Sequence, residues 1–67
     1  MYLVYILHAP ENRAGFLKIE RLSNLQYQLQ QSGLLDQALF FPVDGLKDAK
    51  LLSTFANMLL ENDVLPQ

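Results

Sequence analysis

The sequence predicts a small α/β domain, a βαβα unit with two parallel strands and two amphipathic helices. Two short apolar runs, at residues 2–7 and 38–41, have no polar alternation, which is typical of strands buried on both faces. Each run is followed by a segment whose apolar residues recur with the period of a helix. The first such segment has the length of a crossover helix, so we expect the two strands to be parallel neighbours. With 67 residues, the chain is expected to form one small domain over residues 1–67.

The composition excludes several kinds of chemistry. The chain is 51% hydrophobic and 18% charged, which indicates a folded protein. It has no cysteine and one histidine, so disulfides, thiolate catalysis and His/Cys metal clusters are excluded. The net charge is −2 and the five Lys and Arg residues are scattered, which argues against binding to nucleic acid. We therefore expect no cofactor, no metal and no nucleic-acid partner.

The chain begins with an apolar stretch that does not have the features of a targeting or membrane segment. Residues 1–7 lack a basic region and are far shorter than the roughly 20 residues needed to span a bilayer. We expect this stretch to be the first strand of a cytoplasmic protein without a membrane span. The lack of cysteine fits a reducing compartment.

The first strand is expected to end near His8, because Pro10 cannot continue a ladder and Asn12 can cap a helix. The first helix is predicted from residue 13 to about residue 32, and Gly33 is expected to stop it in a left-handed conformation. The apolar residues that share one stripe of this helix are Ile19, Leu22, Leu25 and Leu29.

The second strand is expected to close at Pro42. The last helix is predicted from about residue 47 to residue 61, with Asp44 or Asp48 as its N-cap. Asp48 is favoured, because inside the helix it would point into the apolar face. The apolar residues of this helix spread over about 200° of its surface, whereas a surface helix needs about 100°. Phe55 lies in the middle of this wide stripe, so we expect it to be buried, with a cost of about 3–5 kcal/mol for Phe55→Ala.

Polar residues follow both predicted strands, at the ends where ligands bind in parallel sheets. His8, Asn12 and Arg13 follow the first strand, and Asp44 and Gly45 follow the second. If the strands are parallel, these residues converge on one edge and form a ligand-binding site. A simpler interpretation stays open: Asp44 as a turn or cap residue, His8 as a solvated strand end and Arg13 as a surface charge. No catalytic or nucleotide-binding motif accompanies them.

One stretch of the chain is similar to a known enzyme family. After the first strand come Glu20-Arg21-Leu22 and Leu29, then Gly33, then Phe40-Phe41-Pro42-Val43-Asp44-Gly45. This order resembles the N-terminal region of family 25 glycosyltransferases, the lipopolysaccharide-biosynthesis type, over about two thirds of the chain. In that family the catalytic apparatus lies well beyond the Val-Asp-Gly turn. The resemblance therefore implies the nucleotide-sugar-side N-terminal piece of such an enzyme.

A short chain without a catalytic constellation favours a small non-enzymatic interaction or regulatory module that acts through an apolar helix or strand surface. The alternative, implied by the resemblance, is an N-terminal fragment of a family 25-like glycosyltransferase. Two strands and two helices cannot cover every apolar surface of this chain, so we expect a homodimer or another protein partner. The residues expected at that interface are Phe16, Tyr27, Leu51, Phe55, Met58 and Leu59.

Overall fold

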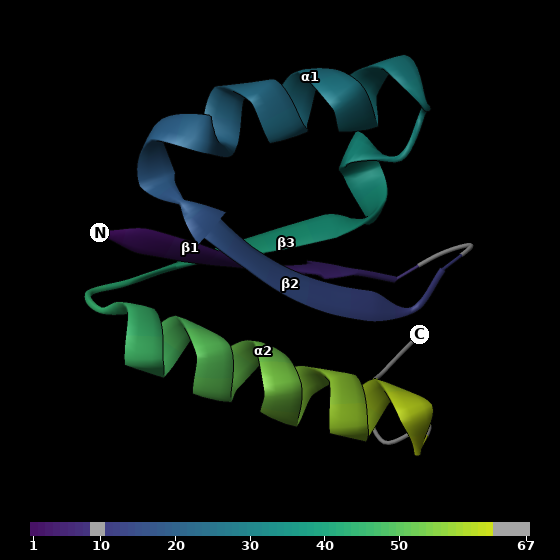
Figure 1. Cartoon of the computed structure of the whole chain (residues 1–67). Coiled ribbons are helices and arrows are strands. Elements are labelled where there is room, and N and C mark those ends of the chain that lie inside the picture. Colours follow the sequence, from purple (N-terminus) through teal and green to yellow (C-terminus); the bar gives the residue numbers. More distant parts are fainter. Residues whose placement is uncertain (9–10, 63–67) are drawn as a thin grey trace.

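The structure, a computed structural model, describes residues 1–8 and 11–62, so Pro10 lies outside the described residues. Figure 1 shows three layers, with a sheet in the middle, helix α1 on one face and helix α2 on the other. The strands are β1 (Tyr2–Leu7), β2 (Arg13–Lys18) and β3 (Ala38–Val43), and the helices are α1 (Leu22–Gln31) and α2 (Leu46–Glu61). Short 3-10 turns at Ile19–Arg21 and Leu35–Gln37 precede α1 and β3.

The sheet has the order β2-β1-β3, and β1 is antiparallel to both of its neighbours. Val4 in the middle of β1 pairs with Phe16 on one side and with Phe41 on the other. The expected pair of parallel strands is therefore wrong. The two strands that α1 connects are β2 and β3, which run parallel to each other with β1 inserted between them. The sequence-based prediction recognised the crossover helix but assigned the wrong strand to its start.

Strand β2 occupies residues that were expected to begin the first helix. Tyr5 of β1 pairs with Gly15, and a Cβ atom on Gly15 would lie 2.5 Å from the Tyr5 hydroxyl oxygen. The tyrosine ring therefore covers the glycine, so this cross-strand pair needs a residue without a side chain at position 15. Ladder hydrogen bonds and this packing outweigh the weak helical pattern of residues 13–18.

Helix α1 begins at Leu22 rather than at residue 13, but its end confirms the prediction. Gly33 has a φ of 72°, in the left-handed region that favours glycine. The Leu34 amide donates to the Leu29 carbonyl at 2.8 Å, and the Gly33 amide donates to the Gln30 carbonyl at 3.1 Å. These two bonds form a Schellman motif, which ends the helix and turns the chain toward β3.

Strand β3 continues through Pro42 to Val43, so the expectation that Pro42 closes the strand is wrong. Pro42 pairs with Leu3, and β3 lies at the edge of the sheet. In an antiparallel ladder only alternate residues turn their backbone groups toward the neighbour. The His8 amide donates to the Gln37 carbonyl at 3.0 Å, which places the Pro42 nitrogen on the outer side. A proline is tolerated there because no donor is needed.

Helix α2 packs mainly on β2 and β1. Its buried residues are mostly small, and they recur at helical spacing: Ala49, Ser53, Ala56 and Leu60. Phe55 is 57% exposed, so the expected phase of this helix is wrong. Small side chains let the helix approach the sheet closely, and the large apolar residues then face away from it.

The start of α2 also differs from the expectation. Gly45 is the N-cap residue, and it makes no side-chain capping hydrogen bond. Asp48 lies inside the first turn and is exposed, so neither Asp44 nor Asp48 caps the helix. A carboxylate in the first turn still interacts favourably with the positive end of the helix dipole, which explains why Asp48 is tolerated there.

Candidate functional site

The residues expected to form a ligand site lie at opposite ends of the sheet. Leu7 pairs with Ala38 and Tyr2 pairs with Val43, so β3 ends beside the start of β1. His8, Asn12 and Arg13 therefore lie at one end, and Asp44 and Gly45 lie at the other. The five residue steps between the ends correspond to roughly 17 Å. The predicted convergence depended on parallel strands, and the antiparallel register separates its members.

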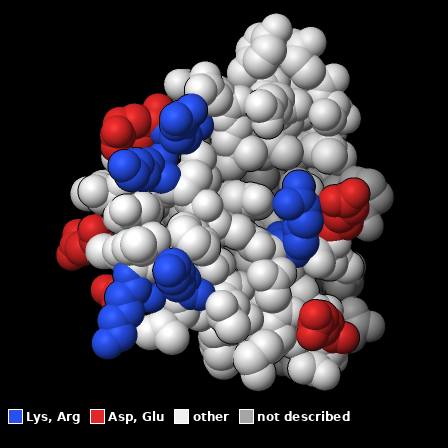
Figure 2. All heavy atoms as spheres, viewed as in Figure 1, with Lys and Arg blue, Asp and Glu red and all other residues white. Residues whose placement is uncertain are grey.

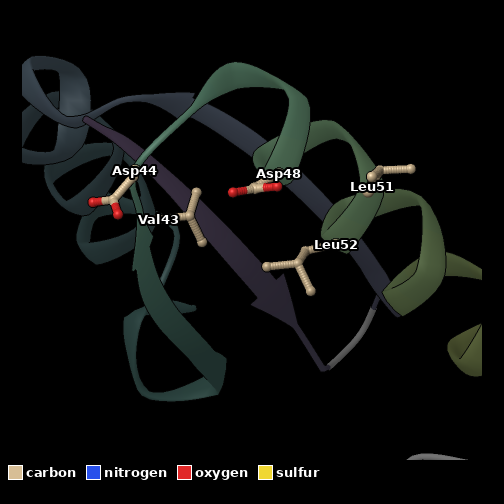
Figure 3. A pocket seen from close by; sticks show the side chains of 5 residues that line it. All are labelled: Val43, Asp44, Asp48, Leu51 and Leu52. Carbon is tan, nitrogen blue, oxygen red and sulfur yellow. The ribbon is translucent and has the colours of Figure 1, made fainter.

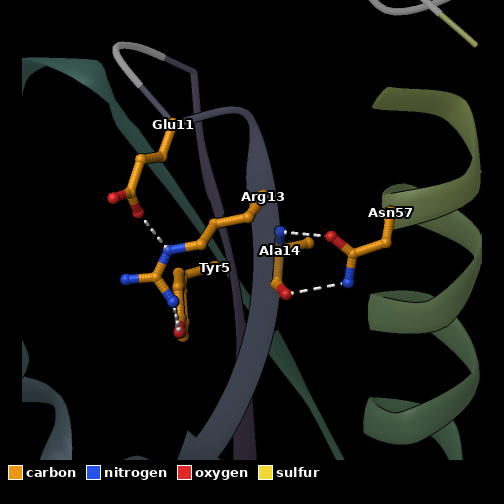
Figure 4. Close-up of polar contacts among 5 residues, drawn as sticks. All are labelled: Tyr5, Glu11, Arg13, Ala14 and Asn57. Carbon is orange, nitrogen blue, oxygen red and sulfur yellow. Dashed lines mark hydrogen bonds and ion pairs between the residues drawn. The ribbon is translucent and has the colours of Figure 1, made fainter. Parts of the chain in front are cut away.

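At the first end, the Arg13 side chain contacts Glu11 and Tyr5. Figure 4 shows Arg13 between Glu11 and Tyr5. The Arg13 Nε donates to Glu11 Oε2 at 3.1 Å, and Arg13 Nη1 donates to the Tyr5 hydroxyl at 3.4 Å. Both charged side chains are more than half exposed. Such an ion pair contributes little stability, and the carboxylate offsets the positive charge that an anionic ligand would need.

Charges on the visible side of the molecule do not form a field of one sign. Figure 2 shows Lys and Arg side chains close to Asp and Glu side chains, with a broad uncharged surface between these groups. A nucleic-acid interface normally shows a basic patch or stripe. This side of the molecule has no such stripe.

The second end of the sheet opens onto a shallow hollow of about 440 Å³. Its lining residues are Val43, Asp44, Asp48, Leu51 and Leu52. Figure 3 shows Val43 of β3 facing Asp48 and Leu52 of α2. The two carboxylates are the charged groups in this lining, and it contains no basic side chain. The hollow therefore does not favour a phosphate or another anion.

A second concavity, of about 380 Å³, continues along α2 and shares Val43 and Leu52 with the hollow. We call it the β3–α2 groove. Its lining residues are Val4, Ile6, Phe41, Pro42, Val43, Leu52, Phe55, Ala56 and Leu59. All of them are apolar. The groove exists because α2 lies over β2 and β1, so the same face of β3 has no helix above it.

Large side chains on and beside both walls of the groove are exposed. Leu39 and Phe41, which alternate on the α2 face of β3, are 48% and 45% exposed. On the helix side, Leu52 is 45% exposed and Phe55 is 57% exposed. A contiguous apolar surface of this kind usually marks an interaction site in a protein.

The structure brings together four of the six residues that the sequence assigned to an interface. Leu51, Phe55 and Met58 are exposed on α2 and Leu59 is half-buried beside them. Phe16 lies on β2 at the far edge of the sheet, and Tyr27 lies on α1 in the opposite layer. Sequence reasoning missed Leu39 and Phe41 on β3 and Leu52 on α2. Phe41 and Leu52 line the groove, and Leu39 lies two residues before Phe41 on the same face of β3. The alternation of β3 would have indicated Leu39 and Phe41, if the strand had been assigned to an edge.

Asn57 fixes the position of α2 on the sheet. The Ala14 amide donates to Asn57 Oδ1 at 2.8 Å, and Asn57 Nδ2 donates to the Ala14 carbonyl at 2.9 Å (Figure 4). The side-chain amide thus takes the place of a neighbouring strand at the outer edge of β2. Sequence reasoning did not single out Asn57, because a lone asparagine in a helix carries no pattern. Its two hydrogen bonds hold α2 toward β2 and away from β3.

Comparisons with protein-family models, with curated proteins and with solved structures found no match. The resemblance to family 25 glycosyltransferases therefore stays a prediction. Within residues 1–8 and 11–62, no helix has the length and apolar character needed to cross a membrane. The same part of the chain contains no group of three or more His, Cys, Asp or Glu side chains arranged to hold a metal ion.

Proposed function

We propose that the chain is a small non-enzymatic interaction or regulatory module that acts through the β3–α2 groove. One observation carries the proposal: α2 covers two of the three strands and leaves an apolar groove beside the third. We place the module in the cytoplasm, which its cysteine-free composition supports.

The chemistry of the groove supports binding rather than catalysis. Its lining has no titratable side chain that could act as a general acid, a general base or a nucleophile. It has two aromatic anchors, Phe41 on one wall and Phe55 on the other. Aromatic side chains that enter a partner's pocket commonly dominate the binding free energy of an interface. The groove therefore suits an apolar side chain or an amphipathic helix from a partner.

A photo-crosslinking experiment tests the proposal. Phe55 is replaced by a photoreactive phenylalanine analogue in cells that make the chain, and the neighbouring exposed residue Thr54 is replaced in a matched control. Thr54 lies on the polar side of α2, so it is not expected to face a partner. A defined protein adduct from position 55 and none from position 54 supports the module. Equal adducts from both positions, or no adduct from position 55, contradict it.

The alternative function is the nucleotide-sugar side of a glycosyltransferase, which the acidic lining of the hollow disfavours and only the place of the hollow in the chain favours. The hollow of about 440 Å³ lies at Val43 and Asp44, within the turn that carries the resemblance. Titration of the chain with uridine and cytidine diphosphates, followed by NMR, tests this function. Shifts at Asp44 and Gly45 at millimolar ligand, absent in Asp44→Asn, would support it. No shift at that concentration would exclude it.

A further inference from the structure

We propose that the partner of the β3–α2 groove is a second copy of this chain, with the two α2 helices packed antiparallel around a two-fold axis at Phe55. The inference rests on the proposed function, because it takes the groove as an interaction surface. It goes further by naming the occupant and its orientation.

The pattern of α2 indicates that the occupant is a helix. One stripe of α2, from Ala49 to Leu60, is buried on its own sheet. Beside that stripe, toward β3 and solvent, lies a second one that we call the outer stripe: Leu51, Leu52, Phe55, Met58 and Leu59. The other four members lie three or four residues before or after Phe55, which is the spacing of a seam between two helices. A helix packed on this stripe also covers the groove, because three members of the stripe line it: Leu52, Phe55 and Leu59.

The outer stripe is complementary to itself. Phe55 lies at its centre, so a two-fold axis at Phe55 sets Leu51 opposite Leu59 and Leu52 opposite Met58 of the second copy. Apolar residues meet apolar residues at every position of the stripe. An interface between two identical copies needs a surface that is complementary to itself. An interface with a different protein does not need this property.

The charges next to the stripe favour the antiparallel orientation. Asp48 lines the same hollow as Leu51 and Leu52, so it lies beside the stripe near the start of α2. In a parallel pair Asp48 would approach Asp48 of the second copy, and like charges at an interface are unfavourable. In an antiparallel pair Asp48 lies opposite Asn62, whose amide can donate a hydrogen bond. The helix dipoles also oppose each other in this arrangement.

The exposed area is adequate for a dimer. The large side chains that flank the groove and the outer stripe are about half exposed: Leu39, Phe41, Leu51, Leu52, Phe55 and Met58. At roughly 200 Å² for each side chain, they expose about 600 Å² per copy, close to the roughly 800 Å² that each partner buries in a standard interface. This patch is at the upper end of the roughly 300–600 Å² that the largest apolar patch of a monomer covers, and patches of that size are often functional.

Sedimentation of two matched variants tests the dimer. The unmodified chain at micromolar concentration is expected to sediment at twice its mass of 7.7 kDa. Phe55→Lys is expected to weaken association at least about 30-fold, the loss typical of a hot-spot side chain, while Thr54→Lys leaves it unchanged. Both residues are exposed, so neither substitution disturbs the core of the monomer. A monomer for the unmodified chain, or equal effects of the two variants, would overturn the proposal.

Single cysteines test the orientation, because the chain has no cysteine of its own. Phe55→Cys is expected to form a disulfide with its own copy. Leu52→Cys and Met58→Cys are expected to form one only when the two variants are mixed. In the antiparallel pair two copies of position 52 are about 9 Å apart along the axis, too far for a disulfide. Disulfides of Leu52→Cys with itself would overturn the antiparallel arrangement.

The two proposals can fail separately. A photo-crosslinked adduct from position 55 that contains a different protein, together with a monomeric chain in sedimentation, would overturn the dimer and uphold the interaction module. A monomer without any adduct would overturn both. An adduct of twice the chain mass supports both.

Discussion

The two edge strands of this sheet have the same length and the same central neighbour, but their edges differ. Strand β2 carries Arg13 and Lys18, and the Asn57 amide occupies the outward backbone groups of Ala14. Strand β3 carries no charged residue, and only Pro42 removes a donor from its outer side. Charged side chains, prolines and covering elements are the usual ways to prevent an edge from pairing. The β2 edge is thus better protected than the β3 edge.

The position of α2 accounts for the difference. Small residues face the sheet and Asn57 binds the β2 edge, so the helix lies over β2 and β1. The surface of β3 and the large residues of α2 then stay uncovered together. The exposed apolar patch is therefore a consequence of where the helix is anchored, and an interface is the simplest use for it.

The largest expected change in the free energy of unfolding is for a substitution on the sheet side of α2, compared with one on its outer side. Leu60 is 5% exposed on the sheet side, so Leu60→Ala should lower the free energy of unfolding by about 2–5 kcal/mol. Phe55→Ala on the outer side should cost less than about 1 kcal/mol in the monomer. Urea unfolding at a concentration low enough to keep the chain monomeric measures both. A cost for Phe55→Ala equal to that for Leu60→Ala would mean that α2 has the opposite phase.

The second prediction concerns the anchor. Asn57→Ala leaves the Ala14 amide and carbonyl without their partner, which should cost about 1–3 kcal/mol. Hydrogen exchange at the Ala14 amide should become faster. Asn24→Ala, at an exposed position of α1, is the matched control and should change little. Unchanged exchange at Ala14 in Asn57→Ala would show that the anchor does not form.

A third prediction compares two glycines, one within strand β2 and one at the N-cap of α2. Gly15→Ala would place a Cβ 2.5 Å from the Tyr5 hydroxyl, and displacing that ring should cost about 1–3 kcal/mol. Gly45 has open space around its Cβ position and a φ of −120°, but it is the N-cap of α2, where alanine is less favourable than glycine, so Gly45→Ala should cost about 0.5–1 kcal/mol. Thermal unfolding of the two variants checks the order. Equal melting temperatures would contradict the close packing of Tyr5 on Gly15.

The smallest expected effect is on the β3 edge. Pro42→Ala restores a backbone donor on the outer side of β3, where the monomer makes no use of it, so stability should change by less than about 0.5 kcal/mol. Slow formation of larger aggregates should increase, because one protection of the edge is lost. Light scattering over several days measures the formation of these aggregates. A gain in stability without aggregation would show that the Pro42 nitrogen faces inward, because the new N–H would then bond to β1.

Sequence patterns predicted the elements better than their arrangement. The strand at residues 2–7, the stop at Gly33 and the last helix to within one residue follow from apolar runs, a glycine and periodicity, which are local signals. Strand β2 was missed because its apolar residues continue into those of α1 with a period close to that of a helix. Gly15, which disfavours a helix, was the local signal against this interpretation. Because β2 was not recognised, the helix was expected to connect β1 directly to β3, and strands joined in this way are parallel.

The phase of α2 shows a different limit. Its apolar residues cover more than one side, and the sequence does not say which side belongs to the chain's own sheet. Large residues such as Phe55 suggested the core, whereas Ala49, Ser53 and Ala56 occupy it. The choice depends on how closely the helix approaches the sheet and on Asn57, both of which are tertiary features. The groove could therefore be found only after the register and the anchor were known.

NOE spectroscopy of the dilute, isotope-labelled chain shows whether α2 lies over β2 and β1 and leaves β3 uncovered. We expect contacts between the Asn57 side-chain amide protons and the Ala14 amide proton, and contacts from Leu60 to β1 or β2. Contacts from Ala49 or Ser53 to Leu39, together with none between Asn57 and Ala14, would place the helix over β3 and contradict the account.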